Sequence, residues 1–249
     1  MRGAIAPILA AFAFAVSAAA LGGCAAPTTE ALAANDPFEA ENRAIYRLDQ
    51  RFDKYVVLPV AWVYVYYLPA PIHRSLHNFV LNLDLPVTFA NDVLQGDADR
   101  AATALGRFAM NSTLGLGGVV DLARQAGLDY RAADFGQTLG RWGVPEGPFL
   151  VLPIIGPDPP RDLVGDVADL SLDPFLYLPP AEPFYGRVLS AVTLRIVSPF
   201  EEHARNIVLR NELARGSLDP YFTMRGIYRQ LRADEIGEGL PDVENPDAK

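Results

Sequence analysis

The chain has 249 residues, half of them apolar and a fifth charged, with 21 Lys+Arg against 30 Asp+Glu and a net charge of −9. This length suffices for a buried core in one domain or at most two, and the composition excludes disordered and fibrous classes. The acidic balance excludes binding to nucleic acid or to anionic lipid surfaces through long-range attraction.

The first 23 residues have the features of a lipoprotein signal peptide. Arg2 precedes a charge-free stretch over 3–20 that is rich in Ala, Phe, Ile and Val, as is typical of the apolar part of a secretory signal. Gly22 and Gly23 then precede Cys24, which resembles the lipobox of bacterial lipoproteins. We therefore expect cleavage between Gly23 and Cys24. The alternatives are an ordinary signal peptide, or a transmembrane anchor with an incidental cysteine.

Cys24 is the single cysteine of the chain, so an intramolecular disulfide is excluded and lipidation is the better explanation for it. Each acyl methylene contributes roughly 0.8 kcal/mol on burial, so a triacyl group at Cys24 would anchor the protein stably. An Asp directly after the lipidated cysteine would favour retention in the inner membrane. The chain has Ala25 at that position, and the absence of the Asp favours the outer membrane. Cleavage would remove Arg2 alone among the charged residues and leave 20 basic against 30 acidic ones, a net charge of −10.

The mature chain divides into a tether, a helical body and a tail. Residues 24–35 are small and without periodicity, so we expect a flexible, lipidated tether. A single domain over 36–236 follows, and 237–249 form an acidic tail that we expect to be disordered. Asp36-Pro37-Phe38-Glu39 predicts a capped helix start, with Glu39 completing a capping box.

The body is predicted to be mainly α-helical. An apolar stripe at helical spacing follows the first helix start, at Phe38, Ile45, Leu48 and Phe52. Further helices are expected to begin near Pro199 and at Asp219-Pro220, and shorter helical patterns cover 71–83, 86–95, 97–111, 118–126 and 159–169. One β-hairpin is predicted around 144–148, followed by the apolar run 149–155.

Eighteen consecutive residues without a charge, Tyr55–Ile72, are the most unusual segment. Their number suits a transmembrane helix, but Pro59, Pro69 and Pro71 argue against a straight span. Aromatic residues of the kind found at lipid–water interfaces fill the segment, namely Tyr55, Trp62, Tyr64, Tyr66 and Tyr67. Three hypotheses stay open: a membrane-interface segment, a buried core helix, and a true span.

Motifs for enzymatic chemistry are missing, and no cofactor or metal is expected. Lys54 and Lys249, the lysines of the mature chain, lie outside any phosphate-binding loop, and no serine has a G-x-S-x-G setting. His73 and His77 have the spacing of a zinc pair without its glutamate, so a surface or capping role is expected. The acidic positions 162, 166 and 169 share a helix face that we expect to be solvated.

Many spaced motifs resemble the MlaA (VacJ) lipoproteins over 36–230. The carriers are Asp36-Pro37-Phe38-Glu39, Asn42-Arg43, Tyr46, Asp53-Lys54-Tyr55, Leu58-Pro59-Val60-Ala61, Asn78-Phe79, Asn82-Leu83, Pro86-Val87, Asn91-Asp92, Leu94-Gln95-Gly96, Gly106-Arg107-Phe108, Asn111-Ser112-Thr113, Gly115-Leu116-Gly117-Gly118, Asp121, Phe135-Gly136-Gln137-Thr138-Leu139-Gly140, Trp142-Gly143-Val144, Gly147-Pro148-Phe149-Leu150-Val151-Leu152-Pro153, Gly156-Pro157, Arg161-Asp162 and Asp219-Pro220-Tyr221.

This resemblance implies a ring-shaped helical domain with interfacial amphipathic helices, held by its lipid in the inner, periplasmic leaflet of the outer membrane. A central channel would remove misplaced phospholipids from the outer leaflet and pass them to a soluble periplasmic carrier, beside a trimeric porin. Gly115, Gly117, Gly118, Gly136 and Gly140 would suit a pore wall or hinge, with turn and packing roles as the alternative. The competing function is a periplasm-facing scaffold without transport, in which Tyr55–Ile72 is core.

Overall fold

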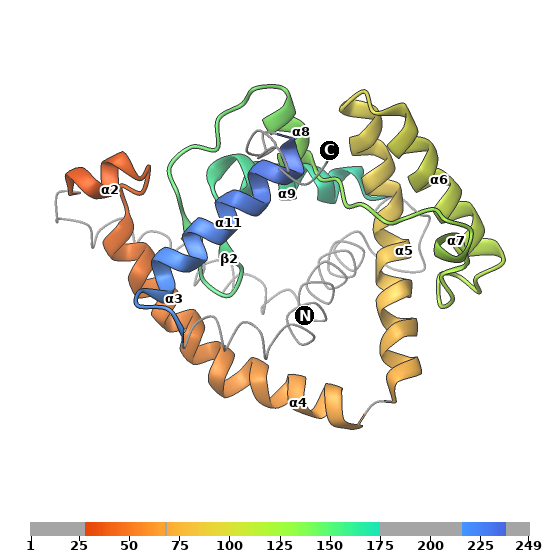
Figure 1. Cartoon of the computed structure of the whole chain (residues 1–249), viewed down its shortest axis with the longest axis horizontal. Coiled ribbons are helices and arrows are strands. Elements are labelled where there is room, and N and C mark those ends of the chain that lie inside the picture. The colour runs from red at the N-terminus through yellow and green to blue at the C-terminus, as the bar shows by residue number, and fades with distance from the viewer. Residues whose placement is uncertain (1–27, 68, 175–215, 238–249) are drawn as a thin grey trace, which may run out of the picture. The chain divides into compact units, whose positions relative to one another are not determined.

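The computed structural model of the protein describes residues 28–67, 69–174 and 216–237, and this part is mainly α-helical with one short hairpin (Figure 1). In chain order the elements are α2 (Thr29–Ala33), α3 (Glu39–Phe52), the π-helical turn η1 (Asp53–Val57), α4 (Leu58–Tyr67), α5 (Ala70–Leu94), α6 (Ala98–Thr113), α7 (Leu122–Gln125), α8 (Phe135–Arg141), β1 (Val151–Leu152), β2 (Gly156–Pro157), α9 (Pro160–Leu172) and α11 (Pro220–Ile236). The mainly helical class with one hairpin is confirmed.

Helix starts were predicted better than helix lengths. Asp219 caps α11 by accepting hydrogen bonds from two backbone N–H groups, Pro220 occupies the first turn, and Gly237 ends the helix at φ +86°. By contrast, 71–83 and 86–95 form one helix, α5, which continues through Pro86. Packing against α6 overrides the local cost of the proline.

Three further expectations are wrong in detail. The segment expected to be a tether contains the short helix α2, which Thr28 caps. Glu39 does not complete a capping box but pairs with Arg43 one turn later, at 2.7 Å. The hairpin turn is at 153–155 rather than 144–148, because Leu152 pairs with Gly156 in the antiparallel register. The signal peptide, the predicted helix near Pro199 and the tail after residue 237 lie outside the described residues.

The described residues form two compact units. The first contains 28–52 and 146–160, and the second contains the remainder. In the first unit, the side-chain amide of Asn42 on α3 forms hydrogen bonds with the backbone of β1 and the residues before it, as a neighbouring strand would. Its amide N–H₂ donates to the Phe149 carbonyl (2.9 Å) and to the Asp36 carboxylate (2.8 Å), and its Oδ1 accepts from the Val151 N–H (3.0 Å). One buried amide thus joins α3 to β1.

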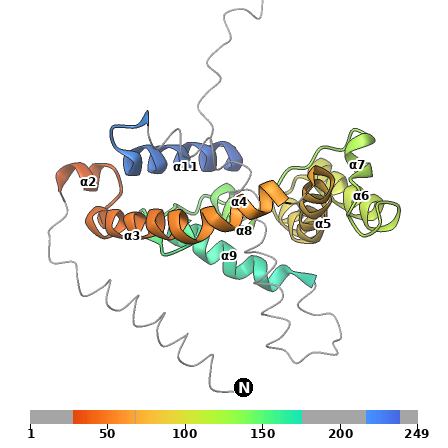
Figure 2. The same cartoon turned by 90° about the horizontal axis from the view of Figure 1, so that it is seen from below.

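In the second unit, α6 packs along α5 and α7 packs against α6, as two views show (Figures 1 and 2). Ala101 and Ala104 are buried in α6, and such small side chains permit close helix approach. At the other end of α6, the buried Arg107 donates to the Asp121 carboxylate at 2.9 Å and to the Leu128 carbonyl. Burial alone would raise the pKa of Asp121, but its hydrogen bonds from Arg107 and Asn111 lower that pKa below the usual value.

The interior is unusually polar. Among the described residues, 16 polar or charged side chains are buried against 13 apolar ones, six of which are alanine. Large apolar side chains are instead exposed on most helices. The stripe predicted on α3 follows this rule: Phe38 and Leu48 are exposed, and Asn42 is the buried residue of the helix. Periodicity places the four apolar residues on one stripe, and in the structure Ile45 and Phe52 of that stripe are half-buried.

Replacing Asn42 tests the polar link between α3 and β1. Asn42→Ala should lower the free energy of unfolding by about 2–4 kcal/mol, because it leaves a buried carbonyl and a buried N–H without partners. Urea denaturation followed by circular dichroism measures the change. Asn78→Ala is the control, since Asn78 makes an exposed 3.4 Å hydrogen bond and should cost little. Equal stability of the two variants would contradict the role given to Asn42.

Candidate membrane-facing surface

The charge-free segment folds as the turn η1, the helix α4 and the start of α5, and each proline is placed where a helix tolerates it. Pro59 is the second residue of α4, directly after the π-helical turn. A proline cannot donate to the carbonyl four residues back and its ring clashes there, so the wider turn before it relieves both problems. Pro69 and Pro71 flank the first residue of α5, where N–H groups have no helical partner anyway.

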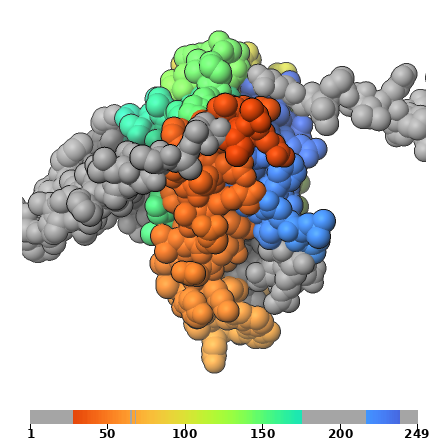
Figure 3. Space-filling view, turned by 90° about the vertical axis from the view of Figure 1, so that its left-hand side faces the viewer, coloured from red at the N-terminus to blue at the C-terminus, as the bar shows by residue number. Residues whose placement is uncertain are grey.

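The helix α4 is apolar on every side, yet it is not buried. Tyr67 is 80% exposed, Tyr55 70%, Tyr66 69% and Trp62 51%, and Ala61 is the one buried residue among those of the segment whose burial the structure describes. In Figure 3 the orange surface at the lower end of the view includes α4. A helix that is hydrophobic all round belongs in an apolar environment, and an exposed patch of this kind marks a membrane or partner contact. The exposure argues against the core-helix hypothesis.

The aromatic side chains of α4 are arranged in two ways. Trp62 and Tyr66, one turn apart, stack with ring centroids 4.6 Å apart and form a flat exposed surface. Tyr64 points elsewhere and packs on the His73 ring at 4.3 Å, while the His73 Nε2 lies 2.7 Å from the Tyr64 carbonyl oxygen. His73 therefore ties the end of α4 to α5, which agrees with the expected capping role.

The segment has charges only at its ends. Lys54 precedes it and lies over the Tyr55 ring at 5.4 Å, and Arg74 is the first charged residue after it. Such an arrangement, an apolar stretch with aromatic rings and terminal cations, is typical of a segment at a membrane interface. In the part of the chain that the structure describes, no helix has the length and hydropathy needed to cross a membrane.

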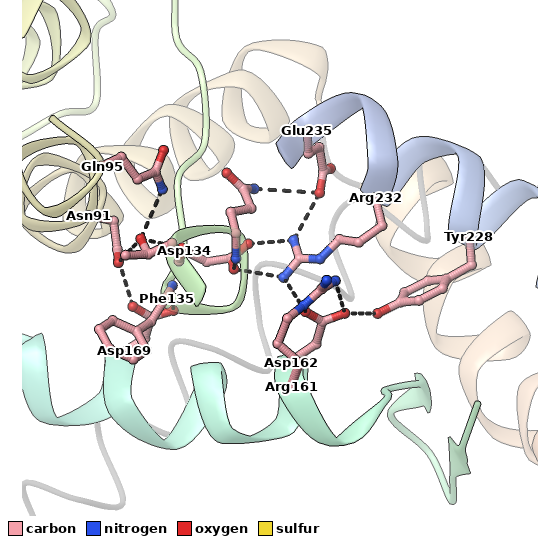
Figure 4. A network of polar contacts seen from close by, with 12 residues as sticks. Asn91, Gln95, Asp134, Phe135, Arg161, Asp162, Asp169, Tyr228, Arg232 and Glu235 are labelled. Atoms are coloured by element: carbon pink, nitrogen blue, oxygen red, sulfur yellow. Dashed lines mark hydrogen bonds and ion pairs between the residues drawn. The ribbon is translucent and has the colours of Figure 1, made fainter. Parts of the chain in front are cut away.

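On the inner side of the second unit, one arginine joins three helices. Arg232 of α11 donates to both oxygens of Asp134, which precedes α8, at 2.7 Å each, and to Asp162 of α9 at 3.0 Å (Figure 4). Tyr228 also donates to Asp162, at 2.7 Å. Burial would raise the pKa of Asp162, but hydrogen bonds from Arg161, Arg232 and Tyr228 lower it. The two carboxylates hold the pKa of Arg232 above its usual value against the effect of burial.

A second polar chain continues from this cluster to α5. Asn91 donates to Asp169 of α9 at 2.7 Å and accepts from the Thr138 hydroxyl at 2.9 Å. The other Asp169 oxygen accepts from the Phe135 N–H at 3.0 Å, so one carboxylate joins α5, α8 and α9. Asp162 and Asp169, expected on a solvated face, are therefore buried and partnered, and the apolar Val164 and Val167 of α9 are exposed instead. The spacing of these aspartates in the sequence gave no sign that Arg232 binds Asp162 or that Asn91 binds Asp169.

Of the five glycines proposed for a channel wall or hinge, four lie in tightly packed positions and the fifth, Gly117, does not. A side chain at Gly136 would meet Arg232 and Asp162 at 2.5 and 2.7 Å, one at Gly140 would meet Ile236 at 2.6 Å, and one at Gly115 would meet the Val120 carbonyl at 2.3 Å. Gly118, at φ +96°, lies against Asn82. Gly117, at φ +74°, has open space around it. Packing thus explains why four of these positions exclude larger residues.

The described residues contain no cluster of three or more His, Cys, Asp or Glu side chains suited to a metal ion. Their arrangement combines a surface that apolar surroundings would stabilise with an interior in which many polar side chains pair with one another. This is the distribution expected when helices meet lipid on the outside, where polar side chains face inward and pair with each other.

Comparisons with known proteins agree with this arrangement. The family model described as "MlaA lipoprotein" matches residues 34–235. The chain belongs to the MlaA lipoprotein family. It is 36% identical to the intermembrane phospholipid transport system lipoprotein MlaA of Escherichia coli K12, with 94% of each chain covered, and 35% identical to its counterpart in Haemophilus influenzae, with 90% and 89% covered.

A solved structure of the family has the same fold. It is described as "Structural basis for maintenance of bacterial outer membrane lipid asymmetry", and it matches with a TM-score of 0.70 and 31% identity over 81% of this chain and 98% of the other. The resemblance found from the spaced motifs is therefore confirmed, and it extends over almost the whole body of the chain.

Removing the Arg232 charge should destabilise the junction of α8, α9 and α11. Arg232→Met leaves Asp134 and Asp162 without their main partner, so the unfolding free energy should fall by about 3–5 kcal/mol near neutral pH. The pKa of Asp162 is lower in the folded state than in the unfolded state. Its ionised carboxylate therefore stabilises the fold above the unfolded pKa, and this stabilisation is lost as the pH falls through the folded pKa. The deficit of the variant should therefore shrink on acidification. Arg124→Met, at an exposed site, is the control.

Asp92 should have the opposite pH dependence. No described residue donates a hydrogen bond to its Oδ1, and burial raises its pKa from 3.8 to about 6 against the influence of Arg100. The folded state then binds the proton more tightly, so stability falls by roughly 3 kcal/mol as the pH rises from 3.8 through about 6.

The variant that tests this is Asp92→Asn, which carries no charge to bury. It should be more stable than wild type at about pH 7.5, and this advantage should vanish at about pH 4.5. Thermal unfolding at both pH values measures the difference, with Asp129→Asn as an exposed control. A stability gain that is equal at both pH values would argue against a charged, buried Asp92.

Proposed function

We propose that this protein is a non-enzymatic outer-membrane lipoprotein that takes phospholipids misplaced in the outer leaflet through a channel and passes them to a soluble periplasmic carrier. Membership of the MlaA lipoprotein family supports the proposal, as do relatives named for intermembrane phospholipid transport. The observation that carries it is the exposed apolar surface of α4 over a polar interior.

Letting phospholipids pass through a channel is a task that fits a chain without a nucleotide-binding motif. Drawing both acyl chains of a phospholipid through water would cost roughly 25 kcal/mol, at about 0.8 kcal/mol per methylene. A channel need not supply this energy; it has to shield the chains while the head group follows a polar path. The scaffold hypothesis lacks this support, because it requires the aromatic residues of α4 to be core, and Trp62, Tyr66 and Tyr67 are exposed.

The remaining parts of the proposal concern how the protein is held. Residues 1–23 would be removed as a signal peptide, and Cys24 would carry the lipid that anchors the domain 36–236 in the periplasmic leaflet of the outer membrane. Tyr55, Trp62, Tyr66 and Tyr67 would place η1 and α4 at the lipid–water interface. Tyr64, which the sequence also offered for this role, packs on His73 instead and is left out of the proposal. A trimeric porin would lie beside the domain, and Gly115, Gly117, Gly118, Gly136 and Gly140 would give the channel wall its close approaches or its hinge.

The deciding experiment measures phospholipid in the outer leaflet of intact cells. Deleting the gene should raise this content, wild type should restore it, and Cys24→Ala should not, because the protein would lose its anchor. The combined variant Trp62→Ser, Tyr66→Ser and Tyr67→Ser should also fail, since it removes the apolar ring surface of α4.

The matched control replaces the same three residues by leucine, which keeps an apolar surface but removes the rings. It should restore activity at least partly if apolar area is what α4 provides. An unchanged outer leaflet after deletion, in cells that also lack outer-leaflet phospholipases, would refute the transport proposal and favour the scaffold.

A further inference from the structure

The hairpin of the first unit ends in two exposed aliphatic side chains. Its turn is Pro153-Ile154-Ile155, between β1 and β2. Ile154 is 71% exposed and Ile155 is 60% exposed. Water-facing turns normally carry Gly, Asn, Asp or Ser, which suit both the backbone geometry and the solvent. Two adjacent isoleucines at a turn are therefore placed against both preferences.

The backbone at Ile154 makes this choice costly. Its φ of +73° lies in the left-handed region, and no other β-branched residue of the described chain has a positive φ. Glycine adopts this conformation freely, whereas a β-branched side chain is strained there. Residues held in such conformations point to a functional requirement for their side chains. At Ile154 that requirement is an apolar side chain at the very end of the hairpin.

The turn is fixed rather than loose. The Ile154 N–H donates to Asp49 Oδ1 of α3 at 2.8 Å. At the base of the hairpin Phe149 is completely buried and Val151 is 2% exposed, and the Asn42 amide binds both of their backbones. The isoleucines are thus held outward by contacts within their own unit, and they do not fold back onto α3.

The chemistry of the tip favours lipid over protein. Residues 149–157 carry no charge. Two side chains offer far less than the roughly 800 Å² per partner that a stable protein interface buries. The tip also lacks the Trp, Tyr and Arg that dominate protein–protein hot spots. A bilayer needs no complementary shape, and isoleucine is among the residues that enter hydrocarbon most favourably.

We propose that the Ile154-Ile155 tip inserts among the acyl chains of the membrane that holds the protein, as a contact separate from α4. The proposal rests on the membrane location in the proposed function. It assigns a membrane contact to the first unit, which holds neither α4 nor the Arg232 cluster.

A tryptophan at the tip reports its depth. The full-length, lipidated protein carrying Trp62→Phe, Trp142→Phe and Ile155→Trp is reconstituted in phosphatidylethanolamine–phosphatidylglycerol vesicles, with and without brominated acyl chains. Emission should shift to the blue, and brominated chains should quench it by about twofold or more. The matched control places the tryptophan at an exposed position of the same unit, Glu30→Trp, where quenching should be small.

Two results would overturn the proposal. Quenching no greater than in the Glu30→Trp control would place the tip outside the hydrocarbon. A blue shift without quenching would mean that the side chain is buried against protein, for instance a second copy of the chain, rather than in lipid.

A second variant separates insertion from folding. Ile154→Gly, added to the Ile155→Trp protein, should raise the melting temperature because glycine removes the strain at φ +73°. It should at the same time reduce quenching, because half of the apolar tip is gone. A higher melting temperature with unchanged quenching would show that Ile154 makes no membrane contact. Both readouts are independent of lipid transfer, so this test can fail while the proposed function stands, and the reverse.

Discussion

The interior of this protein is held by polar side chains that pair with one another, and its stability depends on each of those pairs being complete. Arg232 illustrates the constraint. Largely enclosed between α11 and the α8–α9 region, it is neutralised by Asp134 and Asp162, and Asp162 is in turn bound by Tyr228 and Arg161. A buried charge without its partner costs several kcal/mol, so these groups stabilise the fold only as a set. Apolar packing, which tolerates small changes, contributes through few large residues here.

The same arrangement determines what the outer surface can be. Asn42 is the buried residue of α3, and Asp162 and Asp169 are buried in α9, whereas Leu48 of α3 and Val164 and Val167 of α9 are exposed. In water this would be an aggregation hazard, while at a membrane it is the favourable orientation. The helix α4 and the isoleucines at the hairpin tip are the extreme cases, since both expose large apolar side chains in segments that carry no charge.

The polar interior is accompanied by close packing of the backbones of α8 and α9. Gly165 of α9 leaves so little room that an added side-chain carbon would lie 2.3 Å from the backbone N of Gly136. This approach accompanies the hydrogen bond that joins α9 to the start of α8, in which the Phe135 N–H donates to the Asp169 carboxylate, as Figure 4 shows. The glycines are therefore conditions for the polar network as well as for the turns.

The sequence by itself determined the helical class, the helix starts at Asp97 and Asp219, the charge-free aromatic segment and the family, because caps, prolines and spaced motifs are local signals. It also placed an apolar stripe on α3 correctly. Only the tertiary structure decided that Phe38 and Leu48 of this stripe are exposed, that Pro86 lies inside one long helix, and that Asp162 and Asp169 are buried. Periodicity identifies the two faces of a helix, but which of them is buried depends on partners such as Arg232, which lies 70 residues from Asp162 along the chain.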